Sequence, residues 1–170
     1  MRATPNTVHP RPEGDTLLSS IPAVLRNRKG MLSVWGYTFH SWELLGLWAW
    51  LPAFLTAALM ASGSSGAEAA ATALSLSALT FSAIADSSVH STVIAESVPP
   101  HILGAAYAVR SVLGFGTGVV SPVVFGWALD LAGGGRASGD AFAWGVAWAT
   151  LGLGALLGPV ATWRLQKIAK

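Results

Sequence analysis

None of the seventeen residues of LLGLWAWLPAFLTAALM, residues 44–60, is charged, which indicates a helix surrounded by lipid. The hydrocarbon core of a bilayer is about 30 Å thick, and about 20 apolar helical residues are needed to cross it. The apolar region around this stretch is long enough, and so are three later ones. We therefore predict an all-α polytopic membrane protein with four transmembrane helices, at about residues 31–61, 67–98, 102–132 and 141–163.

The composition also favours lipid over water as the solvent. Hydrophobic residues make up 52% of the chain and charged residues only 11%, whereas an ordinary soluble domain has roughly 25% charged residues. The chain has no cysteine, which excludes disulfides and thiolate metal sites. The excess of basic residues is small, and these residues lie near the ends of the chain. We therefore expect the protein to interact with the lipid bilayer and not with nucleic acid.

The basic residues predict the orientation. Eight of the ten Lys and Arg residues lie in two polar tails, residues 1–30 and 164–170, and the linkers at 62–66 and 133–140 hold only Arg136. Cytoplasmic segments carry the excess of Lys and Arg, so we expect a cytoplasmic N-terminal arm, residues 1–30, and a cytoplasmic tail, residues 164–170. The expected location is a bacterial inner (plasma) membrane. Within the arm, residues 16–25 are either a surface helix interrupted by Pro22 or disordered.

Glycine is concentrated in the last two predicted spans. Gly114 and Gly118, like Gly154 and Gly158, are four residues apart. This spacing lets two helix backbones approach closely. We expect these glycines to serve helix packing, with a functional hinge as the alternative.

Five ionisable residues fall within the predicted spans: His40, Glu43, Asp86, His90 and Arg110. Residues three or four apart share a helix face, so His40 with Glu43, and Asp86 with His90, each form a polar stripe. Counted from the cytoplasmic ends, His40, His90 and Arg110 should form one layer, with the two carboxylates about a turn deeper. Pairing the carboxylates with Arg110 and the imidazoles would lower the cost of burying them.

Two interpretations of this layer stay open. In one it is a proton-coupled substrate site, where Glu43 or Asp86 binds and releases a proton and Arg110 holds an anion. In the other it is a structural polar network that locks the helices together. No HExxH or GxSxG motif occurs, and His40 and Glu43 supply only two ligands on one helix. We therefore expect no catalytic residues, no metal and no cofactor, and hence no enzyme.

Two segments resemble a known family. Residues 27–55, NRKGMLSVWGYTFHSWELLGLWAWLPAFL, are similar to the opening of the C-terminal half of a major facilitator superfamily transporter, with a basic loop followed by the seventh helix. Residues 85–130, which end in SPVVFGWALD, resemble the end of the tenth helix, a cytoplasmic turn and the eleventh helix. Residues 141–163 would be the twelfth helix.

The chain also departs from that family. Members have twelve helices in two halves, with the substrate site between the halves, whereas this chain has room for four. The GxxxDRxGRR-type loop is missing, and residues 67–85 resemble an eighth helix that runs directly into a tenth. The resemblance implies a shortened relative or fragment of a secondary active transporter for a small solute, working with a second copy or a complementary transporter half. The alternative is a small non-transporting membrane module that packs with another membrane protein.

Overall fold

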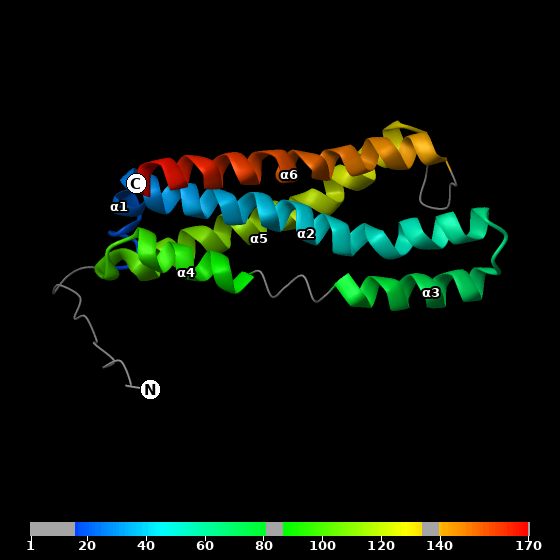
Figure 1. Ribbon diagram of the computed structural model, residues 1–170, viewed down its shortest axis with the longest axis horizontal. Coiled ribbons are helices and arrows are strands. Elements are labelled where there is room, and N and C mark those ends of the chain that lie inside the picture. The colour runs from blue at the N-terminus through cyan, green and yellow to red at the C-terminus, as the bar shows by residue number, and fades with distance from the viewer. Residues whose placement is uncertain (1–15, 81–86, 134–139, 170) are drawn as a thin grey trace.

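The computed structural model describes residues 16–80, 87–133 and 140–169, and all regular structure within these ranges is helical (Figure 1). Three helices are long and apolar enough to cross a membrane: α2, α5 with the turn before it, and α6. This supports a membrane-embedded helical protein. In chain order the elements are α1 Ile21–Arg26, α2 Arg28–Ala61, α3 Gly66–Leu79, α4 Ser87–Ser97, the 3₁₀ turn η2 Pro100–Ile102, α5 Leu103–Leu131 and α6 Ala141–Ala169.

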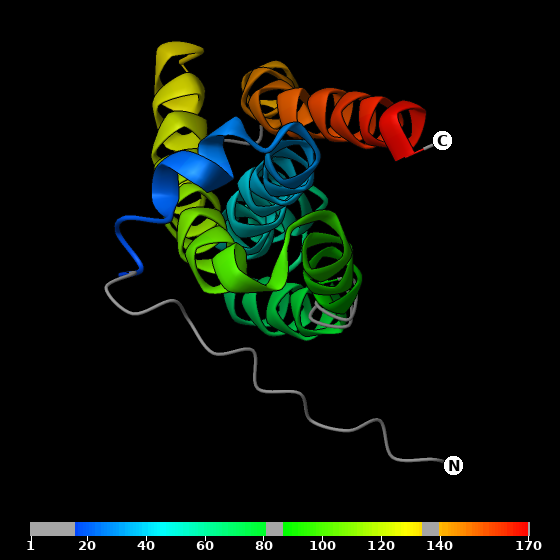
Figure 2. The same cartoon turned by 90° about the vertical axis from the view of Figure 1, so that its left-hand side faces the viewer.

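The second predicted span, 67–98, corresponds to two shorter helices. Helix α3 has 14 residues and α4 has 11, and each is below the roughly 20 needed to cross a bilayer. Residues 81–86 between them lie outside the described part of the chain. The two helices lie in line beside α2, as both views show (Figures 1 and 2).

Local sequence signals explain where the helices begin and end. Asn27 caps α2, since its side chain accepts a hydrogen bond from the third backbone N–H of the helix at 2.9 Å. Ser65 and Glu68 form a capping box at the start of α3. Gly63 and Gly133 follow the ends of α2 and α5 with φ values of +98° and +80°. Glycine suits this left-handed conformation, which commonly ends a helix.

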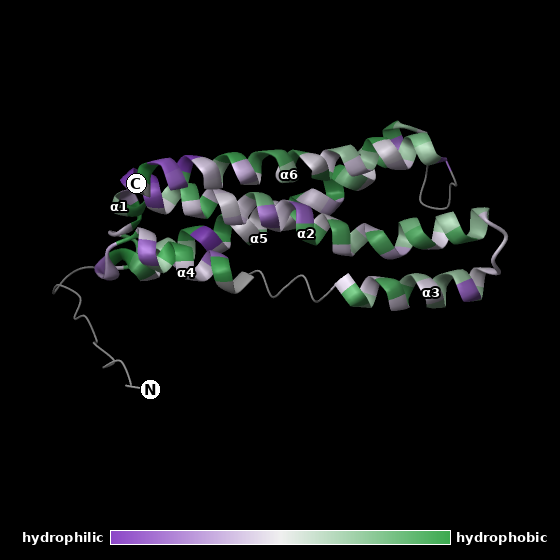
Figure 3. Ribbon diagram, viewed as in Figure 1, coloured by the Kyte–Doolittle hydropathy of each residue, from purple (hydrophilic) through white to green (hydrophobic). Residues whose placement is uncertain are grey.

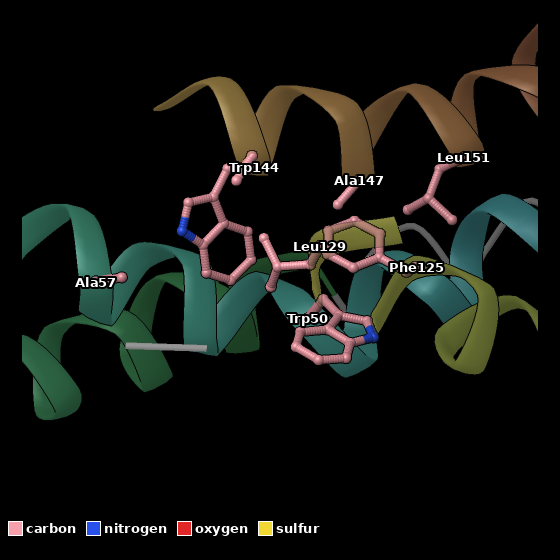
Figure 4. Close-up of a cluster of buried hydrophobic side chains, with 8 residues drawn as sticks. Trp50, Ala57, Phe125, Leu129, Trp144, Ala147 and Leu151 are labelled. Carbon is pink, nitrogen blue, oxygen red and sulfur yellow. The ribbon is translucent and has the colours of Figure 1, made fainter. Parts of the chain in front are cut away.

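Helix α2 is the centre of the bundle and contacts α1, α3, α4, α5 and α6 (Figure 2). One hydrophobic core joins α2, α5 and α6 (Figure 4). In it Trp50 stacks on Phe125, with ring centroids 5.1 Å apart, and its indole N–H donates to the carbonyl oxygen of Pro122 at 2.8 Å. Trp144 and Leu151 cover this pair from α6.

A second core lies at the other end of the bundle and includes α1. Val24 of α1 is fully buried, together with Val34, Ile94 and Ile102. Residues 16–25 were expected to be either a surface helix or disordered. Disorder does not describe α1, because this helix packs against the bundle. Helix α2 begins at Arg28, so the last residues of the predicted arm belong to this helix.

The outer surface and the ends of the bundle differ in chemistry. Large apolar side chains on α5 and α6 are exposed, among them Val112 at 73% and Leu156 at 70%, and green turns recur along α6 before its purple C-terminal end (Figure 3). Such a surface suits lipid. Five described basic side chains gather where α2 begins and α6 ends: Arg26, Arg28, Lys29, Arg164 and Lys167. Glu96 is also at this end, while Glu68, Asp130 and Asp140 lie at the other end.

Candidate functional site

Two of the predicted ionisable residues meet where α2 faces α4. The imidazole rings of His40 and His90 stack with centroids 5.2 Å apart and an interplanar angle of 28°. The ring of Tyr37 meets His90 edge-on, with centroids 5.8 Å apart. Asp86, predicted to share a helix face with His90, lies outside the described residues.

Among the described residues, Arg110 joins this group through an aromatic ring. Its guanidinium carbon lies 3.6 Å from the centroid of the Tyr37 ring, a cation–π contact. The buried Nε atom of Arg110 has no hydrogen-bond partner among the described residues. The expected pairing of Arg110 with Glu43 is not found in this part of the chain.

The rotation of α2 explains why Glu43 and Arg110 are apart. An α-helix turns about 100° per residue, so the six residues from Tyr37 to Glu43 place them on different faces. Tyr37 faces α5, where Arg110 lies. Glu43 faces α6, because a Cβ atom added at Gly154 would lie 3.4 Å from the Cβ of Glu43. His40 lies between these two faces and turns toward α4.

A cavity of about 270 Å³ lies between α4 and α6, with α2 as its floor. We call it the polar cavity. Its ionisable lining residues are His40, Glu43 and His90, while α6 contributes Gly154 and other small residues. The buried Nε2 atom of His40 has no hydrogen-bond partner among the described residues. A water molecule occupies about 30 Å³ of liquid, so the space suits several waters or a small solute.

Four lining residues of the polar cavity were not among the predicted site residues: Gly36, Ala155, Pro159 and Thr162. Thr162 lies at the α6 wall, and its hydroxyl donates to the carbonyl oxygen of Gly158 at 3.1 Å. Gly36 lines the floor on α2. The sequence does contain a signal for Thr162. It follows Gly154 and Gly158 at four-residue spacing and so shares their helix face.

The predicted packing glycines contact α2 within the chain. A Cβ atom at Gly114 would overlap the ring of Tyr37, and one at Gly118 would overlap the side chain of Leu45. At Gly154 the added atom would lie 2.7 Å from the backbone oxygen of Phe39, whereas at Gly158 it would make an ordinary contact. Gly114 therefore lets α5 approach Tyr37, and Arg110, one turn earlier, lies over the same ring.

Several hydrogen bonds between neutral groups cross between helices near the site. The hydroxyl of Ser121 donates to the carbonyl oxygen of Trp42 at 2.5 Å, and the indole of Trp42 donates to the carbonyl oxygen of Thr150 at 3.0 Å. Ser33 and Ser97 share a hydrogen bond of 3.0 Å between α2 and α4. The bundle therefore has a structural polar network that is distinct from the ionisable lining of the polar cavity.

Compared with known protein families, curated proteins and solved structures, this chain matches none. The resemblance to the major facilitator superfamily therefore stays a prediction from the residues. The described residues contain no group of three or more His, Cys, Asp or Glu side chains placed to hold a metal ion. The polar cavity offers two imidazole rings and one carboxyl group as hydrogen-bonding groups.

Proposed function

We propose that this chain is an integral membrane protein with four spans and both termini in the cytoplasm. In this proposal α3 and α4 are parts of one crossing, supported by their alignment beside α2 (Figure 1). Helix α2 begins and α6 ends at the same end of the bundle, as an even number of crossings requires (Figure 1). The basic side chains at this end favour the cytoplasmic side.

We further propose that the chain belongs to a secondary active transporter for a small solute, as a shortened relative of the major facilitator superfamily or a part of one. The polar cavity is the observation that carries this proposal. Ionisable groups within a membrane are rare and commonly mark paths for ions or substrates. Glu43, with His40 and His90 beside it, is the proposed proton-binding group.

Arg110 has a separate role in this proposal. It does not line the polar cavity but lies on the Tyr37 ring beside it, so a bound anion would be held at some distance from Glu43. The side between α4 and α6 is open, and transporters of this kind place their site between two halves. We propose that a second copy or a complementary transporter half completes the site.

Currents measured on solid-supported membranes would test the proposal. The purified protein would be reconstituted in proteoliposomes. The outside concentration of a sugar, an amino acid, a carboxylate or an amine would then be raised rapidly, with and without a pH gradient. We expect at least one class to evoke a current that Glu43→Gln reduces to background. The matched control is Glu96→Gln, which removes an exposed carboxylate on α4 and should leave the current unchanged. Well-inserted wild-type protein that responds to none of these solutes would refute transport of them by copies of this chain alone.

A non-transporting membrane module is the second candidate, favoured by the neutral hydrogen bonds that hold the helices together. In that case Glu43→Gln, and likewise Asp86→Asn, would change the assembly of the protein in detergent, and no solute would evoke a current. Sedimentation of the same variants would therefore separate the two proposals.

A further inference from the structure

A second hollow lies between α2 and α6, on a different side of α6 from the polar cavity. Its volume is about 280 Å³, and its walls are apolar except at one end; they include Leu32, Trp35, Phe39, Leu157, Val160 and Arg164. We call it the α2/α6 groove. Trp35 and Phe39 stack along one wall, with ring centroids 5.8 Å apart. Unlike the polar cavity, this groove has a single charged lining residue, Arg164.

The groove exists because α5 and α6 diverge. At one end of the bundle they pack together through Phe125, Leu129 and Trp144. Toward the other end α6 continues along α2 while α5 leaves at an angle (Figures 1 and 2). The side of α2 between the diverging helices is left open there.

The groove has about the depth of one lipid leaflet. It continues into an adjoining hollow of about 210 Å³ that shares Trp35 and Phe39 and reaches Trp42 and Leu153. Ten residues separate Leu32 from Trp42, which corresponds to about 15 Å along a helix. This is half of the roughly 30 Å hydrocarbon core.

Positive charge lies at the mouth of the groove, where a lipid headgroup would lie. Arg164 lines the mouth, and the exposed Arg28 lies one helical turn before Leu32. Lys167 follows one turn after Arg164, with its ammonium nitrogen 3.6 Å from the centroid of the Trp163 ring. A guanidinium group binds phosphate through paired hydrogen bonds. Basic pockets between helices at the cytoplasmic surface suit anionic lipid headgroups.

From the apolar length and the charged mouth, we propose that the α2/α6 groove binds one anionic phospholipid. One acyl chain lies against Trp35 and Phe39, and the phosphate lies on Arg164 and Arg28. This site is separate from the polar cavity, so it stands whether or not the protein transports a solute.

Native mass spectrometry of the full chain tests the site directly. The detergent-purified protein is mixed with equal amounts of palmitoyl-oleoyl phosphatidylglycerol and palmitoyl-oleoyl phosphatidylcholine. We expect the wild type to retain phosphatidylglycerol preferentially. Arg164→Gln should lower its retention about fivefold, the effect of one basic residue near an anionic surface. Arg26→Gln is the matched control, because Arg26 belongs to the same basic end but does not line the groove.

A second pair of variants tests the apolar part of the groove. Val160→Trp fills the groove and should lower the retention of both lipids, whereas Val123→Trp on the outer face of α5, where Val123 is 68% exposed, should lower neither. Equal retention of the two lipids by the wild type would overturn the proposal, as would equal losses in Arg164→Gln and Arg26→Gln. Competition by soluble glycerol phosphate as strong as that by the whole lipid would show a phosphate site and would also overturn it.

Discussion

Replacing Gly154 by alanine tests how closely α6 approaches α2. The added methyl group would lie 2.7 Å from the carbonyl oxygen of Phe39, an atom of the α2 backbone that cannot rotate away. Gly152, two residues earlier on the same helix, has open space where its methyl group would go. The same chemical change at these two positions therefore separates crowding from helix propensity.

The magnitude follows from two effects of opposite sign. Glycine in the interior of a helix is less favourable than alanine by about 0.5–1 kcal/mol, so both substitutions gain this amount. Overpacking of a close contact costs about 1–3 kcal/mol and applies only at Gly154. We expect Gly152→Ala to be neutral or stabilising, and Gly154→Ala to be less stable than Gly152→Ala by about 1–3 kcal/mol.

Unfolding in mixed micelles with increasing dodecyl sulfate would measure this difference. The eight tryptophans of the chain report unfolding by fluorescence, and circular dichroism would confirm that both variants start with the helix content of the wild type. Equal midpoints for Gly152→Ala and Gly154→Ala would refute the close approach of the two backbones.

Two further predictions concern the end of the bundle that holds α1. A double-mutant cycle of Ser33→Ala and Ser97→Ala, whose hydroxyl oxygens lie 3.0 Å apart, should give a coupling energy of about 0.6 kcal/mol in the same micelle assay; a coupling of zero would contradict the hydrogen bond. Val24→Asp should release α1 from the bundle, because Val24 is fully buried, and tryptic cleavage after Arg26 should then be faster than in the wild type. Leu25→Asp changes an exposed position and should leave the cleavage rate unchanged. Equal cleavage rates for the two variants would contradict the packing of α1.

The long helices were predictable because hydropathy acts locally. Helices α2, α5 and α6 begin and end within a few residues of the predicted spans at 31–61, 102–132 and 141–163, except that α6 continues to Ala169. This extension carries Arg164 and Lys167, whose long side chains can keep their charge in water while the helix continues. Hydropathy measures only the apolar length and therefore does not show how far α6 continues beyond it.

The candidate site was predictable in part, for a similar reason. Helical spacing puts His40 and Glu43 on one stripe. Counting residues from the cytoplasmic ends of the predicted spans puts His40 at the depth of His90, and the two rings are in contact. The contact of Arg110 with Tyr37 was not predictable, because it depends on how α2 and α5 are each rotated about their own axes. That rotation shows only in contacts between the helices, such as that of Gly114 with Tyr37, which a single sequence does not reveal.

Helix α2 is the core of the folded bundle and is synthesised before α5 and α6. About 40 residues separate its end from the start of α5, and at a synthesis rate of about 5–20 residues per second this takes a few seconds. During that interval Tyr37 has no Arg110 over its ring, and Glu43 has no α6 beside it. We expect nascent α2 to stay at the insertion machinery until its later neighbours emerge, so that ribosome pausing before α5 would lengthen its exposure to proteolysis.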